Sequence, residues 1–103
     1  MDARPVSREQ HGDREFVTRR IADETIIVPV VHGVGDLDAI FTLNAVGSHI
    51  WQLIETPTTV AALIDAIVEE FDVPHHRAER DVPEFLDRLA EAGLIRPLPE
   101  PVR

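Results

Sequence analysis

The first half of the chain contains three runs in which β-branched and apolar residues dominate or alternate with polar ones, at residues 15–21, 25–31 and 38–43. Such runs are typical of half-buried β-strands. Residues 22–24 form a turn between the first two runs, which predicts an antiparallel hairpin. Pro29 has no N–H to give to a sheet, so the second strand should be bulged there or face an edge at that residue.

A helical period replaces this pattern after the third run. Asn44 carries a short side-chain acceptor that suits the N-cap of a helix over residues 45–54. The next helix has the most regular pattern, because its apolar residues recur at i, i+3, i+4, i+7, i+8 and i+11 and so form one stripe. That stripe consists of Val60, Leu63, Ile64, Ile67, Val68 and Phe71, and Thr58 or Thr59 is the expected cap.

A third helix is predicted near the C-terminus, but a proline interrupts its pattern. Pro83 would cost about 3 kcal/mol or more inside a helix. Asp81 and Glu84 lie three residues apart, as in a capping box. We therefore expect a short helical turn at residues 75–80 and a kink or a restart at Asp81.

The third helix should end at Gly93, since glycine is the preferred residue just past a helix C-terminus. Leu94 and Ile95 then return to the core. The residues expected in one shared core are Trp51, Leu63, Ile67, Phe71, Phe85 and Leu89, and Phe16 and Phe41 are also expected to be buried.

These elements predict an α+β fold in which a three-stranded antiparallel sheet precedes three helices. A chain of 103 residues is one domain by length. Its polar residues 1–13 show no periodicity and predict a loose N-terminal tail, whereas residues 14–96 should form the folded unit. Residues 97–103 contain three prolines and predict a tail that cannot continue a helix.

Composition restricts the classes of function. The absence of cysteine excludes disulfides and thiolate metal sites. No apolar run approaches the roughly 20 residues that span a bilayer, and the N-terminus lacks the apolar core of a secretory signal. We therefore expect a cytoplasmic protein without a membrane partner. The net charge is −9, and residues 55–95 hold ten acidic side chains against three arginines, which predicts no nucleic-acid partner.

Candidate catalytic and metal-binding groups are sparse. His75 and His76 are adjacent, so on a helix they point about 100° apart and make a poor shared metal site. Ser48 and His49 face apart for the same reason and do not form a nucleophile–base pair. We therefore expect no catalytic residue, no metal and no cofactor, and the protein should not be an enzyme.

A sheet of three strands leaves an open edge, which presents unpaired N–H and C=O groups. The third strand has neither a proline nor a lysine that would block pairing along residues 38–43. Proteins use such edges to recruit an extended peptide as an added strand. The third helix could form the wall of a groove beside this strand.

Two separated motifs resemble those of the PqqD family over roughly residues 15–96. The first combines Asn44, Gly47 and Trp51 at the junction of the third strand and the first helix. The second consists of Asp81, Val82, Phe85, Leu86, Leu89, Gly93, Leu94 and Ile95. Members of this family are winged-helix-like peptide-binding domains, also called RiPP recognition elements, which hold the leader of a precursor peptide while other enzymes modify its core.

The resemblance implies that a leader peptide is added to the third strand, against the third helix, and that a radical-SAM enzyme, another modifying enzyme or a leader peptidase is a further partner. Asp81 and Arg88 would steer the peptide, while Phe85 and Leu89 would anchor it or would belong wholly to the core. The residues expected to bind the peptide are Ile40, Phe41, Thr42, Leu43, Asp81, Phe85, Arg88 and Leu89.

Two alternatives remain at the level of sequence. A winged helix that binds DNA has a compatible topology, although the acidic third helix argues against it, and a structural adaptor is also compatible. The resemblance is weaker before residue 36, where two glycines lengthen the loop after the second strand. That departure favours a general member of the family over the protein of pyrroloquinoline quinone synthesis.

Overall fold

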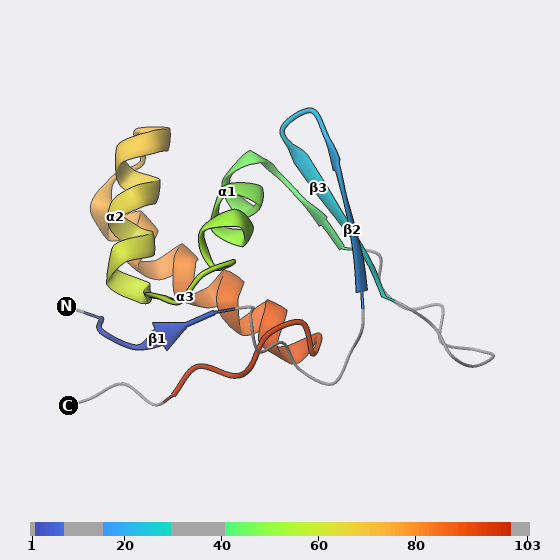
Figure 1. Ribbon diagram of the computed structural model, residues 1–103. Coiled ribbons are helices and arrows are strands. Elements are labelled where there is room, and N and C mark those ends of the chain that lie inside the picture. Colours follow the sequence, from blue (N-terminus) through green and yellow to red (C-terminus); the bar gives the residue numbers. More distant parts are fainter. Residues whose placement is uncertain (1, 8–15, 30–40, 100–103) are drawn as a thin grey trace.

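The three strands and three helices expected from the hydrophobic pattern occur in the expected order, together with two strands of two residues each that the pattern does not predict (Figure 1). This computed structural model describes residues 2–7, 16–29 and 41–99. Its elements are β1 (Pro5–Val6), β2 (Phe16–Ile21), β3 (Glu24–Pro29), β4 (Phe41–Leu43), α1 (Ala45–Leu53), β5 (Thr58–Thr59), α2 (Val60–Phe71) and α3 (His75–Glu91).

The main sheet has the order β2-β3-β4, and both pairings are antiparallel. The predicted hairpin and the three-stranded sheet are therefore confirmed. Thr25 and Leu43 lie opposite each other on the face that packs on the helices, and both are buried. The opposite face is open, because Val17, Ile21 and Val28 are exposed on it. Residues 30–31 and 38–40, which were expected to extend two strands, lie outside the described residues.

The junction between β4 and α1 has the capping geometry that the sequence predicts. Asn44 is the N-cap, and its Oδ1 accepts a hydrogen bond from the Gly47 amide at 2.9 Å. The buried Ser48 hydroxyl donates to the Leu43 carbonyl at 3.2 Å and so ties the first turn of the helix to the strand. Trp51 is buried as expected, and the ring of Phe16 meets it edge-on with 5.4 Å between centroids.

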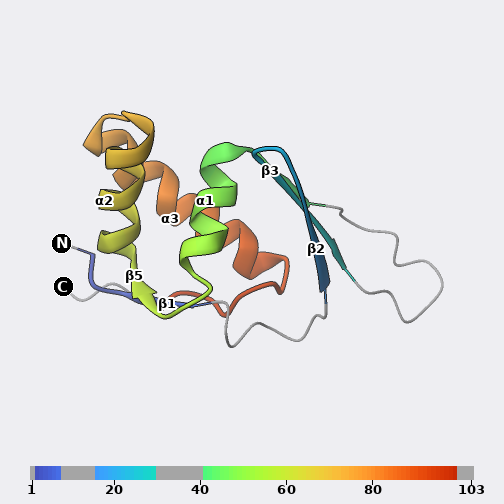
Figure 2. The same cartoon turned by 45° about the horizontal axis from the view of Figure 1, so that its top comes forward.

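The expectation of a loose tail over residues 1–13 is wrong for residues 2–7. β1 pairs with β5, and Val6 is buried in the core. Figure 2 shows β1 beside β5, directly at the start of α2. The reason is that the first amides of a helix have no partner within it. The amide of Val60 donates to the Arg4 carbonyl at 3.0 Å, and that of Ala61 donates to the Asp2 carbonyl at 2.7 Å.

An ion pair holds the N-terminal segment in this conformation. Arg4 donates from Nε to Asp2 Oδ1 at 2.9 Å and from Nη2 to Oδ2 at 2.7 Å. This hydrogen bonding lowers the pKa of the Asp2 carboxyl below its usual value. The pair therefore stabilises the fold above the unfolded-state pKa of Asp2, and its contribution is lost as the pH falls through the lowered pKa.

The predicted restart of the third helix at Asp81 is wrong, because α3 runs without interruption from His75 to Glu91 and contains Pro83. Pro83 removes one hydrogen bond from the helix. A continuous buried stripe at i, i+4, i+8 and i+11 more than offsets that loss. The stripe consists of Ala78, Val82, Leu86 and Leu89.

The end of α3 follows the prediction. Gly93 has a positive φ of 78°, which glycine adopts without steric cost. Its amide donates to the Ala90 carbonyl at 3.0 Å, and the amide of Leu94 donates to the Leu89 carbonyl at 3.0 Å. These two bonds make a Schellman motif. Leu94 and Ile95 then return to the core, as expected.

The core lies between the sheet and the three helices. Trp51, Leu63, Ile67 and Leu89 are buried in it as predicted. The four phenylalanines are an exception, because they are only partly buried and pack on the periphery of the core. They are Phe16, Phe41, Phe71 and Phe85.

Truncation of the α2 stripe should destabilise the fold strongly. Leu63→Ala and Ile67→Ala should each lower the free energy of unfolding by about 2–5 kcal/mol in denaturant titrations, because each leaves a cavity among buried neighbours. Glu69→Ala, at an exposed position of the same helix, is the control and should change it by less than about 0.5 kcal/mol. Losses below about 1 kcal/mol at both core positions would contradict this assignment of the core.

Hydrogen exchange should detect the N-terminal cap of α2. Deletion of residues 1–7 should make the amides of Val60 and Ala61 exchange about tenfold faster or more, because they lose the Arg4 and Asp2 carbonyls. The amide of Ile67, in the middle of α2, is the internal control for global unfolding. Unchanged protection of both amides relative to Ile67 would refute the capping role.

Candidate functional site

The free edge of β4 is the first part of the site. β4 pairs with β3 on one side, and on its other side no strand among the described residues pairs with it. Of its residues, Thr42 is exposed, Phe41 is partly buried and Leu43 is buried. Ile40, also expected to bind a peptide, lies outside the described residues. Figure 1 shows that β4 leads directly into α1, so the edge ends where α1 begins.

A cleft of about 450 Å³ opens at this point, between the first half of α1 and the length of α3. Residues of the connection between α2 and α3 complete its lining. The residues around it are Asn44, Val46, Gly47, Ile50, Ile67, Asp72, Val73, Pro74, Arg77, Ala78, Asp81, Val82, Glu84, Phe85 and Arg88. Asp81, Phe85 and Arg88, which the resemblance proposed as peptide-binding residues, therefore meet in one cleft.

The ring of Phe85 reaches α1 because residue 47 is glycine. A Cβ atom at this position would lie 3.2 Å from Phe85 Cε1 and 3.3 Å from the Cβ of Leu43. Such separations are tighter than nine in ten Cβ contacts in proteins. The glycine therefore allows α3, α1 and the end of β4 to approach within one side chain of one another.

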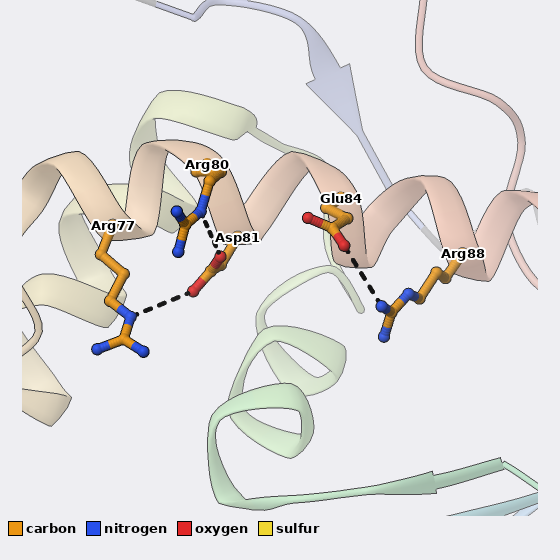
Figure 3. A network of polar contacts seen from close by, with 5 residues as sticks. All are labelled: Arg77, Arg80, Asp81, Glu84 and Arg88. Carbon is orange, nitrogen blue, oxygen red and sulfur yellow. Dashed lines mark hydrogen bonds and ion pairs between the residues drawn. The ribbon is translucent and has the colours of Figure 1, made fainter.

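Charged side chains border the cleft on α3 (Figure 3). Arg77 Nε lies 3.8 Å from Asp81 Oδ2, one helical turn away, and Arg80 Nε lies 3.3 Å from Asp81 Oδ1. Glu84 and Arg88 form a second pair one turn apart, with 3.3 Å between Oε1 and Nη2. All five side chains are more than half exposed, so each pair contributes at most about 1 kcal/mol to the free energy of unfolding.

Leu89 does not line the cleft. Its side chain is 1% exposed, in the interior stripe of α3, which agrees with the alternative that it belongs to the core. Conversely, the hydrophobic pattern alone did not identify the wall contributed by α1. Asn44, Val46 and Ile50 lie on this wall. The signal that indicates it is Gly47, a glycine in the first turn of a helix where alanine would be more favourable.

Within residues 2–7, 16–29 and 41–99, no three His, Asp or Glu side chains are placed to hold a metal ion. No helix in the same described ranges is both long and apolar enough to cross a bilayer.

Comparison with known proteins adds two findings. The family model described as coenzyme PQQ synthesis protein D (PqqD) matches residues 24–95. The solved structure of TbiB1 in complex with the TbiA(beta) leader peptide is similar to this chain, with a TM-score of 0.69 and 32% sequence identity. That match covers 87% of this chain and 98% of the TbiB1 chain. Among curated proteins no match was found.

The matched family region includes β3, β4 and all three helices, and therefore the whole lining of the cleft. The topology expected for the family, a three-stranded antiparallel sheet followed by three helices, is also the topology observed. This chain belongs to the PqqD family.

Proposed function

We propose that this chain is a RiPP recognition element, which binds the leader of a ribosomally made precursor peptide and presents that precursor to a modifying enzyme. The observation that carries the proposal is the edge of β4, which no described strand pairs with and which ends next to Asn44, a residue that lines the cleft between α1 and α3. The similarity to TbiB1, whose structure was solved with a leader peptide, supports it.

In this proposal the leader is added to the sheet as a strand along residues 40–43. Backbone hydrogen bonds to the edge supply affinity, and pockets for alternate side chains supply specificity. The partly buried ring of Phe85 provides an apolar surface in the cleft, and Asp81 and Arg88 lie at its border. Leu89, in the core, holds α3 in position rather than touching the peptide.

The chain itself would perform no chemistry on the peptide. Its partner would be an enzyme that acts on the bound precursor, either of the radical-SAM type or a leader peptidase. Precursor peptides are made by ribosomes in the cytoplasm, so the complex would form there.

DNA binding, the main alternative for a winged-helix-like topology, has the wrong electrostatics. Phosphate backbones are bound through lysine and arginine. Residues 55–95 hold ten acidic side chains and three arginines, a net charge of −7. A duplex would therefore be repelled by the helical face that a winged helix uses for recognition.

Titration with the leader of a precursor encoded beside the gene tests the proposal. Amide NMR shifts should concentrate on residues 38–43 and 81–92, because the added strand would lie between the β4 edge and α3. A scrambled leader of the same composition is the control and should cause no shifts there. Shifts confined to the β2–β3 hairpin, or no binding of any leader from the gene's neighbourhood, would refute the proposed function.

Gly47→Ala should reduce leader binding without a large loss of stability. Alanine gains up to about 1 kcal/mol of helix propensity over glycine, and this offsets the crowding against Phe85, so the stability should change by less than about 1 kcal/mol. The displaced ring narrows the cleft, and leader affinity in calorimetric titrations should fall about tenfold.

Gln52→Ala is the matched control for this variant. It changes an exposed position on the same helix and lies outside the cleft lining, so its leader affinity should stay within about twofold of the original protein. Unaltered affinity of Gly47→Ala would show that the leader does not use the cleft beside Phe85.

A further inference from the structure

The large apolar side chains that are exposed among the described residues all lie on one face of the sheet. Val17, Ile21 and Val28 are 55%, 56% and 38% exposed. Val17 lies directly opposite Val28, and Ile21 follows Val17 by four residues, so the three side chains share a face. Thr25 and Ile27 enter the core from the other face. A single exposed apolar residue is ordinary, whereas a cluster of them marks a surface for interaction.

This outer face of the sheet carries one charge of each sign. Its residues on β2 and β3 are Val17, Arg19, Ile21, Glu24, Ile26 and Val28. Arg19 and Glu24 balance each other, whereas residues 55–95 carry a net charge of −7. The outer face is therefore apolar and without net charge, and it matches a partner surface of the same kind better than a strongly charged one.

We infer that the enzyme that modifies the precursor docks on this outer face through an apolar surface without net charge, and that it touches the bound leader at the same time. This inference rests on the proposed function and specifies where the enzyme binds.

The size of the outer face argues against a second copy of this chain as the occupant. β2 and β3 are each six residues long. Strands of this length are about 20 Å long, and three of them side by side are about 14 Å wide. The footprint is thus roughly 300 Å², whereas each partner of a stable interface buries about 800 Å². Two copies packed face to face would bury too little area, so the occupant needs further contacts beside the sheet.

A leader at the edge of β4 supplies such contacts. Ile26 lies opposite Thr42, which is exposed, so the outer face continues from β3 onto the edge strand. Alternate side chains of an extended peptide point to opposite sides of a sheet. In an added leader strand, one set would point toward the helices and the cleft, and the other set would lie beside Thr42 and enlarge the outer face.

The outer face is also the side from which an enzyme can approach the bound precursor. Figures 1 and 2 both show the hairpin of β2 and β3 at one end of the molecule, with all three helices to one side of it. The core peptide is continuous with the leader, so the enzyme must come close to the sheet to reach it. An enzyme that touches both the outer face and the leader should bind the leader-bound chain more tightly than the free chain.

Removal of apolar surface from β2 tests the docking face. Val17→Thr and Ile21→Thr, combined in one variant, keep β-branched residues in the strand at two exposed positions. In calorimetric titrations of the leader-bound chain with the modifying enzyme encoded beside the gene, the double variant should bind about tenfold more weakly, because a few central apolar contacts carry most of an interface's affinity. Its affinity for the leader should stay within about twofold, since β3 separates β2 from the edge strand.

Thr18→Ser is the matched control, because residue 18 is exposed on the same strand but points to the other side of the sheet. Its affinity for the enzyme should stay within about twofold of the original protein. Thermal unfolding of each variant checks that the fold is retained. With the original chain, the leader should raise the affinity for the enzyme about fivefold or more.

The inference is overturned if the enzyme does not bind, if the double variant binds it as tightly as the original protein, if Thr18→Ser weakens binding equally, or if the leader leaves the affinity unchanged. A dimer in sedimentation that the double variant dissociates would also overturn it, because a second copy would then occupy the face. These results would leave the proposed function standing, since leader binding is measured separately. Failure of every leader to bind would instead refute the proposed function, and this inference with it.

Discussion

The approach of the Phe85 ring to the backbone of Gly47 is the contact on which the arrangement of the site depends. It joins the end of β4, the first turn of α1 and the middle of α3 within one side-chain layer. The Asn44 cap and the Ser48 hydroxyl hold α1 at the end of the strand, so the helix cannot move away without breaking both bonds. A larger residue at position 47 would displace the Phe85 ring and so narrow the cleft.

Most of the fold could be predicted from the sequence because the elements that meet the core bury a regular stripe. Alternate residues of β3, Thr25 and Ile27, are buried, and the i, i+3, i+4 spacing in α2 describes a second face that meets the core, whereas β2 is exposed at every residue except Phe16. β1 and β5 were not predicted, since two-residue strands have no period. Their pairing arises from the need of the α2 amides for acceptors, which is a tertiary requirement. The predicted break in α3 at Asp81 was wrong because the cost of a proline within a helix is local, whereas the burial of Val82 and Leu86 that offsets it is a tertiary effect.

The candidate site was predictable only in part, for a related reason. Asp81, Phe85 and Arg88 could be proposed from the family resemblance, and the structure brings them to one cleft. Leu89 follows Phe85 by four residues, and helical spacing alone did not decide which of them faces the interior. The opposite wall, on α1, depends on how two helices pack around a glycine. The spacing of residues within either helix does not indicate how the two helices pack against each other.

The net charge of the whole chain and the charged side chains at the cleft have different consequences. A net charge of −9 disfavours association with other acidic molecules, and it would also disfavour an acidic peptide. The cleft does not reverse this charge locally, since Arg77 and Arg88 line it together with Asp72, Asp81 and Glu84. Asp81 and Glu84 keep the arginines extended over the cleft without burying them. Because such exposed pairs are weak, they cost little to open when a ligand enters the cleft.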